Sequence, residues 1–199
     1  MTYMVEKITY NGELRLNESM VKHTSWRAGG TAKQFYKPAN INDLIEFLQQ
    51  LPRQESLVWL GLGSNMLIRD GGIKGTVIDM KGINHTIEQT SDTHARFDAG
   101  VTCSKAARFC ARSNMGGAEF LAGIPGTIGG ALAMNAGAFG GETWDHVREV
   151  KTIDRFGVLH TRKREAFDIA YRSVKALEAS GTEWFVSGLF EFHEALDEA

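Results

Sequence analysis

The glycine-rich run between residues 123 and 141 constrains this chain more than any other feature of its sequence. It holds seven of the chain's 22 glycines, in the order GIPGTIGGALAMNAGAFGG. Glycine loses more backbone entropy on folding than any other residue, so this density indicates positions that do not accept a side chain. Two interpretations remain open: backbone N–H groups approach a large ligand there, or small residues let a helix pack close to a sheet.

A second glycine cluster, from Gly61 to Asn65, follows the short apolar run VWL. A Rossmann or Walker site would need a helix directly after such a turn, but the residues from Met66 to Asp79 have the composition of strands. What remains is a turn whose own amides form an anion-binding nest, to which Ser64 and Asn65 add side-chain donors. Two glycine nests in 199 residues favour a ligand of dinucleotide size.

The rest of the chain has the pattern of mixed helices and strands. A helix is expected with Ile41, Leu44, Ile45 and Leu48 on one face, and a short helix is expected to end near Tyr171 and Arg172. Strands are expected near residues 33–37, 57–62, 66–69, 76–80, 95–99 and 184–192, with hairpin turns near 91–94 and 154–157.

Cys103 and Cys110 lie seven residues apart, on one face of an expected helix. About 10 Å of helix rise separates them, which is too far for a disulfide. We expect both to be small core residues. The six histidines show no ligand spacing, so the sequence predicts no metal site.

The composition argues against several classes of partner. A formal net charge of −2 gives no support for nucleic acid or an anionic membrane surface. No apolar stretch approaches the roughly 20 residues that span a bilayer, and no cationic start precedes an apolar run of the kind that directs secretion. We therefore expect no membrane or nucleic-acid partner and a cytoplasmic location.

Four motifs, in this order, give the chain a specific resemblance. They are HTSWRAGG at 23–30, GLGSNMLIRDGG at 61–72, the glycine-rich segment 123–142, and the dipeptide Tyr171–Arg172. Together they resemble the UDP-N-acetylenolpyruvoylglucosamine reductase (MurB-type) family, the flavoenzymes of peptidoglycan precursor synthesis. The residues within the motifs are most similar to the type II branch of this family. The resemblance implies an α+β chain with the two-lobed FAD-binding fold of the vanillyl-alcohol oxidase and p-cresol methylhydroxylase (PCMH-type) group.

The sequence becomes more polar near residues 81–84, and this change predicts a boundary between two lobes. Residues 1–82 are expected to form FAD-binding lobe 1, and residues 83–199 FAD-binding lobe 2, which contains the glycine-rich segment. Members of the family continue into a substrate-binding domain with a catalytic serine and a glutamate, and this sequence has no counterpart of either motif. We expect the chain to lack that domain, to associate with itself, and to have little activity alone.

The resemblance also implies the site residues, with FAD held between the lobes. In the first glycine motif the expected cofactor-binding residues are Gly61, Gly63, Ser64, Asn65, Met66 and Leu67. In the second they are Gly123, Ile124, Pro125, Gly126, Ile128, Gly129, Gly130, Asn135 and Gly137. Arg172 matches the family arginine that stabilises a developing enolate; from the residues alone, a surface salt bridge is the alternative.

By resemblance, the reaction is reduction of UDP-N-acetylglucosamine enolpyruvate to UDP-N-acetylmuramate, with NADPH as reductant and FAD as the redox cofactor. Two alternatives remain open: a non-catalytic flavin-binding module, and another FAD oxidoreductase of the PCMH-type group.

Overall fold

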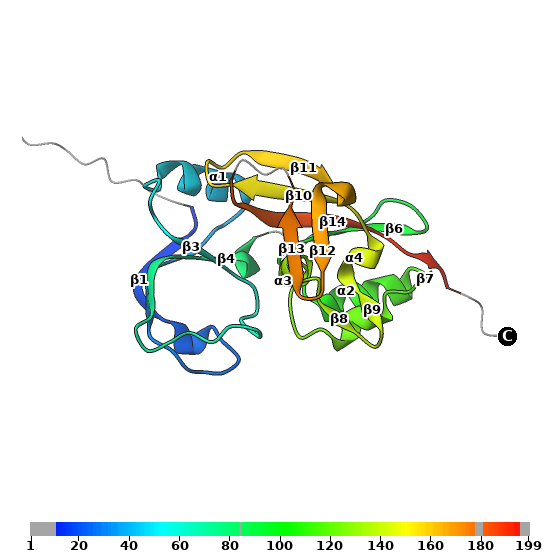
Figure 1. Ribbon diagram of the computed structural model, residues 1–199, viewed down its shortest axis with the longest axis horizontal. Coiled ribbons are helices and arrows are strands. Elements are labelled where there is room, and N and C mark those ends of the chain that lie inside the picture. Colours follow the sequence, from blue (N-terminus) through cyan, green and yellow to red (C-terminus); the bar gives the residue numbers. More distant parts are fainter. Residues whose placement is uncertain (1–10, 84, 178–180, 196–199) are drawn as a thin grey trace, which may run out of the picture.

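The computed structural model describes residues 11–83, 85–177 and 181–195, and two β-sheets form its frame (Figure 1). The four-stranded sheet has the order β1-β2-β4-β3, and the five-stranded sheet has the order β11-β10-β14-β6-β5. Their strands are β1 (Glu13–Ser19), β2 (Thr31–Lys37), β3 (Leu57–Leu60), β4 (Ile73–Asp79), β5 (Ile87–Gln89), β6 (His94–Asp98), β10 (Val147–Asp154), β11 (Leu159–Lys163) and β14 (Glu183–Glu191).

The sheets use separate parts of the chain. All strands of the first sheet end before residue 80, and all strands of the second begin after residue 86. This separation supports a boundary near residue 82, which stays a prediction. The α-helices are α1 (Ile41–Gln50), α2 (Cys103–Arg112), α3 (Ile128–Met134) and α4 (Thr143–His146), and the 3-10 helices are η1 (Met20–Lys22), η2 (Met80–Gly82), η3 (Glu119–Gly123) and η4 (Arg164–Ala166).

Three small two-stranded ladders complete the described chain. They are β7 (Met115–Gly116) with β15 (His193–Glu194), β8 (Gly137–Ala138) with β9 (Gly141–Glu142), and β12 (Phe167–Ala170) with β13 (Ser173–Ala176).

The predicted helix α1 begins at Ile41 because the Asn40 side chain accepts a hydrogen bond from the amide of Asp43 at 3.0 Å. Its buried face carries Leu44, Phe47 and Leu48. These side chains belong to an apolar cluster that also includes Ile78 of β4, Ala99, and Ile153 of β10. Since these residues come from both sheets, the two sheets share one core, on which α1 lies.

The β10–β11 turn of the five-stranded sheet contacts the segment that precedes β3 of the four-stranded sheet. The guanidinium of Arg155, between β10 and β11, donates to the carbonyl oxygen of Pro52 at 3.0 Å and also to that of Glu55. Figure 1 shows α1 next to β10 and β11 at the top of the molecule. The hairpin predicted near residues 154–157 is thus confirmed, and it ties the sheets together.

The cysteines lie on the buried face of α2, as predicted. Both are free and fully buried in the core of the five-stranded sheet. Burial raises the pKa of each thiol to about 12. Because the thiolate is the reactive form, these two residues act as small apolar core residues.

Two predicted elements are wrong. Residues 66–69 are not a strand: they form a loop in which the carbonyl of Arg69 accepts from the amides of Gly30 and Gly72, at 3.1 and 2.9 Å. The helix expected to end near Tyr171 and Arg172 is instead the β12–β13 hairpin, with those two residues at its turn.

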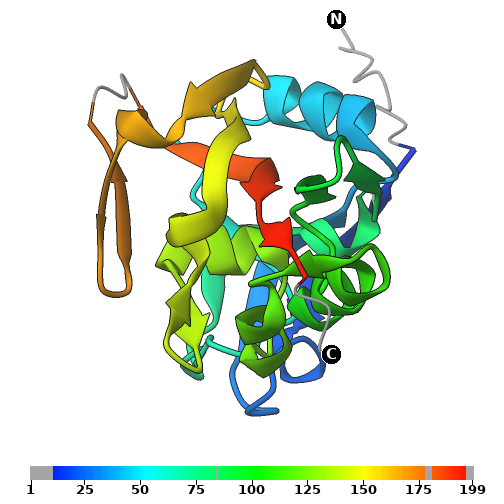
Figure 2. The same cartoon turned by 90° about the vertical axis from the view of Figure 1, so that its right-hand side faces the viewer.

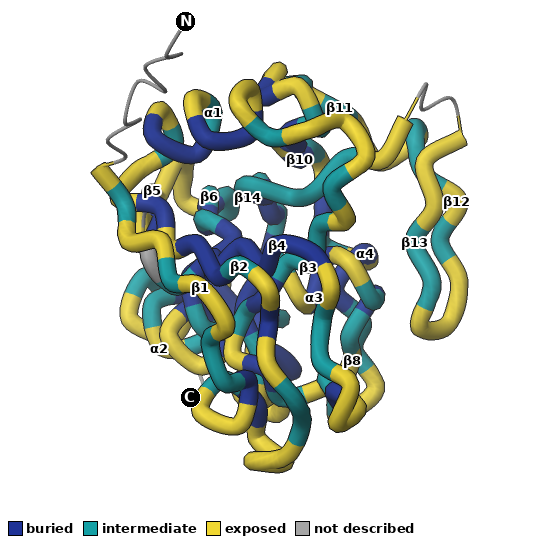
Figure 3. Tube along the Cα trace, turned by 90° about the vertical axis from the view of Figure 1, so that its left-hand side faces the viewer, coloured by how far each residue is buried: buried dark blue, intermediate teal, exposed yellow. Residues whose placement is uncertain are grey.

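The hairpin forms because its apolar residues alternate rather than follow a helical period. Phe167, Ile169 and Val174 are half-buried and pack on the core, while Asp168 and Ala170 are exposed. Figures 2 and 3 show the hairpin standing out from the body of the molecule, with mostly exposed and intermediate residues.

Asp43 provides a test of this packing. Its buried carboxylate accepts from the Tyr36 hydroxyl at 2.6 Å and from the amides of Ala39 and Asn11 at 2.8 and 3.0 Å. Burial alone would raise the pKa of Asp43, but these hydrogen bonds outweigh it and lower the pKa below its usual value. The stabilisation is therefore complete above the usual pKa of about 3.9 and is lost as the pH falls through the lower folded-state pKa.

We expect Asp43→Asn to lower the free energy of unfolding at pH 7 by about 1–3 kcal/mol, and to weaken its decline between about pH 4 and pH 2. Urea unfolding across this pH range measures both effects. Asp92→Asn, in the exposed turn before β6, is the control. Equal pH profiles for the Asp43 variant and the unmodified chain would contradict the assignment.

Candidate cofactor site

A cavity of about 460 Å³ lies where the two glycine motifs meet. We call it the main cavity, residues 61–66 the first glycine loop, and residues 123–137 the second glycine segment. The first loop follows β3, and the second segment contains α3. The main cavity is lined by Trp59, Gly61, Leu62, Gly63, Ser64, Asn65, Met66, Gly123, Ile124, Pro125, Gly126, Thr127, Gly130, Ala131, Ala133, Met134, Ala136, Gly137 and Arg172.

The first glycine loop presents backbone donors. No amide of residues 62–66 donates a hydrogen bond to another described residue. The loop is held from behind, because the amide of Ser25 donates to the carbonyl of Gly63 at 3.1 Å. Gly63 has φ +69°, and a Cβ there would clash with the carbonyl oxygen of His23. A fixed turn with consecutive unpaired amides is a nest for an anionic group.

The two glycine motifs are in close contact at Gly61 and are separated by open space at Gly126. A Cβ on Gly61 would lie 2.5 Å from the hydroxyl oxygen of Thr127, so only glycine allows this approach. A Cβ on Gly126, by contrast, would lie 3.6 Å from Ile124 Cγ2 and 3.9 Å from Ser64 Oγ, in the space between the motifs. Gly126 therefore keeps the cavity open.

The two interpretations of the glycine-rich run apply to different residues: close packing is confirmed at Gly129, and approach of a ligand stays a prediction for the glycines that line the main cavity. Gly129 serves helix packing: its amide donates to the carbonyl of Ala99 at 2.9 Å, and a Cβ would lie 2.8 Å from Ala99 Cβ. Gly123, Gly126 and Gly130 instead line the main cavity.

A smaller pocket of about 230 Å³ adjoins the main cavity, and we call it the side pocket. Five residues line both spaces: Trp59, Gly61, Thr127, Gly130 and Ala133. The side pocket is completed by Leu60, Met80, Ala99, Gly129, Val174, Glu183, Trp184 and Phe185. The two spaces therefore adjoin at these five residues.

Most of the predicted site residues come together here. The main cavity includes Gly61, Gly63, Ser64, Asn65, Met66, Gly123, Ile124, Pro125, Gly126, Gly130, Gly137 and Arg172, and Gly129 lines the side pocket. Their roles as cofactor contacts stay predictions.

Three predicted residues lie outside both spaces. The Leu67 side chain is 71% exposed, and Ile128 is buried in the core of the five-stranded sheet. Asn135 ends α3 with φ +42°, donates to Glu142 at 2.7 Å, and accepts from the amide of Trp144 at 3.1 Å. Asn135 therefore has a structural role.

Arg172 reaches the site from the β12–β13 turn, where it has φ +55°. Its guanidinium lies 6.0 Å from the centre of the Tyr171 ring. Within the described residues it makes no salt bridge. A guanidinium that lines a cavity in this way is available to a negatively charged ligand.

Sequence reasoning did not identify several lining residues. Trp59, Leu62, Thr127, Ala131, Ala133, Met134 and Ala136 belong to the site. The alanines could have been found from the small-residue spacing of the run after Thr127, but the position of Trp59 on β3 carried no signal beyond strand formation.

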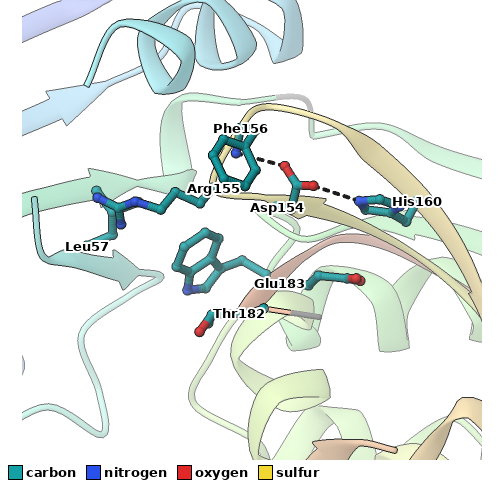
Figure 4. Close-up of a pocket in the computed structure, with 9 residues that line it drawn as sticks. Leu57, Asp154, Arg155, Phe156, His160, Thr182 and Glu183 are labelled. Carbon is teal, nitrogen blue, oxygen red and sulfur yellow. Dashed lines mark hydrogen bonds and ion pairs between the residues drawn. The ribbon is translucent and has the colours of Figure 1, made fainter. Parts of the chain in front are cut away.

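A third cavity, of about 450 Å³, lies at the β10–β11 turn (Figure 4). There Asp154 accepts from the amide of Phe156 at 2.8 Å and pairs with the His160 ring at 2.9 Å. Burial would raise the pKa of Asp154, but these hydrogen bonds lower it overall. They fix the turn whose Arg155 contacts the segment before β3, which is a structural role.

Among residues 11–83, 85–177 and 181–195, no group of His, Cys, Asp and Glu side chains is suited to hold a metal ion. In the same part of the chain, no helix has the length and apolarity to cross a membrane.

Residues 32–162 match the FAD binding domain family, and the chain belongs to this family. It is homologous to UDP-N-acetylenolpyruvoylglucosamine reductases. It is 56% identical over 176 residues to that of Legionella pneumophila (strain Corby), covering 88% of this chain and 56% of the relative. It is 52% identical over 181 residues to that of Alkalilimnicola ehrlichii, covering 90% and 59%.

Solved structures agree with these relatives. The UDP-N-acetylenolpyruvylglucosamine reductase (MurB) from Thermus caldophilus superposes with a TM-score of 0.75 at 25% identity, covering 94% of this chain and 64% of that one. The 6-hydroxy-D-nicotine oxidase from Arthrobacter nicotinovorans shares the fold, with a TM-score of 0.67 at 13% identity, covering 96% and 44%. The predicted α+β, PCMH-type FAD-binding fold is confirmed. The chain spans 56–60% of the length of its curated relatives.

Gly126→Val tests the site directly. The added side chain would enter the space between Ile124 and Ser64 without a backbone clash. We expect it to weaken FAD binding at least about tenfold, or about 1.4 kcal/mol, as measured by flavin fluorescence titration. Gly71→Val is the matched control, because no atom lies within 4 Å of a Cβ there. Equal affinities for the two variants would refute the assignment.

Proposed function

We propose that this chain binds FAD between its two sheets and forms the flavin-binding part of a UDP-N-acetylenolpyruvoylglucosamine reductase. The substrate would be UDP-N-acetylglucosamine enolpyruvate, the product UDP-N-acetylmuramate, and the reductant NADPH. This places the chain in peptidoglycan precursor synthesis, and a cytoplasmic location fits the nucleotide-linked substrates. The observation that carries the proposal is that one cavity brings together both glycine motifs and Arg172.

The residues present fit FAD. The unpaired amides of residues 62–66 suit the pyrophosphate, and the glycines of the second segment let a ligand approach the backbone. The side pocket adjoins the main cavity at Trp59, Gly61, Thr127, Gly130 and Ala133 and adds space to the site. When bound, FAD supplies the hydride-transfer chemistry, and the protein supplies position and electrostatics.

Arg172 has a clear task in this reaction. Hydride addition to the enolpyruvyl group leaves negative charge on the carbon next to the carboxylate. A fixed guanidinium in a site that excludes water stabilises such charge strongly. Arg172 is suited to this role because it lines the cavity and makes no salt bridge within the described residues.

Among the described residues, no Asp, Glu, His, Cys, Lys or Tyr lines the main cavity. Its two side-chain hydroxyls are Ser64, in the first glycine loop, and Thr127, which accepts from the amide of Gly130 at the start of α3. In the side pocket, Glu183 is held by Arg162 at 2.6 Å and by the Thr152 hydroxyl at 2.5 Å. This observation favours one alternative for the isolated chain, a flavin-binding module that does not complete the reaction. Another PCMH-type oxidoreductase activity has no comparable support.

We expect residues 1–199 to accept electrons from NADPH through bound FAD but to reduce the enolpyruvyl substrate at least about 10²-fold more slowly than the full-length Legionella relative, because general acid catalysis contributes about 10²–10⁴-fold. Anaerobic stopped-flow absorbance of the flavin follows both half-reactions.

Arg172→Ala should change little in this chain alone. In a chimera that carries the remaining part of the Legionella reductase, the same substitution should abolish substrate reduction while flavin reduction by NADPH persists. Comparable substrate reduction by the unextended chain and the Legionella reductase would refute this proposal.

We also propose that the chain associates with itself in the absence of FAD. Leu67, Phe139 and Tyr171 are 71%, 85% and 82% exposed, which is high for large apolar side chains. A ligand that binds the folded state stabilises it by mass action, so FAD should reduce association and raise the melting temperature. Light scattering with and without FAD tests this, with Phe139→Ser expected to reduce association. A monodisperse chain whose melting temperature ignores FAD would count against it.

A further inference from the structure

The methionines of this chain divide into two groups by burial. The chain has seven, of which Met1 and Met4 fall outside the described residues. One group is buried in the core and consists of Met20, Met80 and Met115. The other group is Met66 and Met134, which are only partly buried and both line the main cavity. Within the part of the chain that the structure describes, the accessible thioethers therefore lie in the candidate cofactor site.

Met134 differs from Met66 in what its side chain contacts. Met66 packs on the apolar cluster of the four-stranded sheet. Met134 belongs to none of the three apolar clusters that the described residues form. Its sulfur instead accepts a hydrogen bond from the side-chain amide of Asn65, with Nδ2 and Sδ 2.8 Å apart. The Met134 thioether is therefore a cavity group that contacts the first glycine loop, rather than a core group.

The backbone that carries Met134 is fixed in place. Met134 is the last residue of α3, and Asn135 follows it in the left-handed conformation with φ +42°. The Asn135 side chain donates to Glu142 at 2.7 Å and accepts from the amide of Trp144 at 3.1 Å. Because the end of α3 is held in this way, a chemical change of the Met134 side chain acts on the cavity and the loop.

Hydrogen peroxide is the oxidant that an accessible thioether would meet here. The sulfur bonds to one peroxide oxygen, the O–O bond breaks, and the products are the sulfoxide and water, so sulfur gives up the two electrons that peroxide gains. The sulfoxide oxygen is a strong hydrogen-bond acceptor, whereas the thioether sulfur is a weak one. Reduced flavins release peroxide when they pass electrons to dioxygen, so a chain that holds a flavin is exposed to this oxidant.

We propose that Met134 is an oxidation site that controls cofactor binding. Peroxide converts its thioether to the sulfoxide in the FAD-free chain, and the new oxygen holds the Asn65 amide. That oxygen carries partial negative charge beside the first glycine loop, whose unpaired backbone amides suit an anion, so it lowers the affinity for FAD. This rests on the proposed FAD function and adds a modification site to it. The change is reversible, because methionine sulfoxide reductases restore the thioether.

Peptide mass spectrometry after brief treatment of the FAD-free chain with hydrogen peroxide maps the modified residues. We expect Met134 to be oxidised at least about tenfold faster than the three buried methionines, because oxidation follows exposure of the sulfur. Saturation with FAD should slow the oxidation of Met134, since the cofactor would fill the cavity that this side chain lines.

Flavin fluorescence titration before and after peroxide tests the consequence. The affinity of the unmodified chain for FAD should fall about 3- to 10-fold, and the methionine sulfoxide reductases for the two epimers should together restore it. Met134→Leu keeps an apolar side chain of similar size without sulfur, so its affinity, whatever its starting value, should be the same before and after peroxide. Met66→Leu is the matched control and should still lose affinity. The melting temperature of the FAD-free unmodified chain should not fall on oxidation.

Several results would overturn the inference and leave the proposed function intact. They are oxidation of Met134 no faster than that of the buried methionines or at the same rate with FAD bound, an oxidised chain with unchanged FAD affinity, and an equal loss of affinity in Met134→Leu. Protection by Met66→Leu, or a lower melting temperature after oxidation, would also overturn it, by assigning the effect to another residue or to the fold. If the untreated chain does not bind FAD, the proposed function itself fails.

Discussion

The close approach of Gly61 to Thr127 is the contact on which the rest of the site depends. It sets the first glycine loop directly against the start of α3, with no room for even one methyl group between them. The contact works only because the two sheets are already held together elsewhere, through the core under α1 and the carbonyls that Arg155 reaches. Structural contacts and ligand space therefore belong to one interface, since Met80 and Ala99 are part of the core under α1 and also line the side pocket.

The glycine-rich segment shows how one compositional signal carries two physical demands. At Gly129 the demand is helix-to-backbone packing, and at Gly126 it is empty space. Close packing and open space both require glycine, so the sequence alone does not distinguish them. The difference depends on which atoms surround each glycine in the fold. This explains why the site could be located from sequence while the role of each glycine could not.

Other failures of sequence reasoning have the same origin. Leu67 and Ile128 sit within site motifs, yet their side chains point to solvent and to the core, because loop direction and helix phase decide orientation. The β12–β13 hairpin has only a short apolar alternation, and it is stabilised by three half-buried residues that pack on a core built from distant parts of the chain. Strand β1 was not predicted because its apolar alternation is limited to Leu14 and Leu16 in an otherwise polar run, and most of its positions are exposed.

The backbone conformation at Arg172 is unfavourable for an arginine. A non-glycine residue with φ +55° is disfavoured, and Gly or Asn would adopt this turn more readily. Selection for stability alone would therefore replace the arginine. A directed-evolution experiment that rewards only thermal resistance should drift toward glycine at this turn, and in doing so would erase the charge from the cavity. The unfavourable backbone conformation is therefore a cost that the proposed role of the Arg172 charge would have to outweigh.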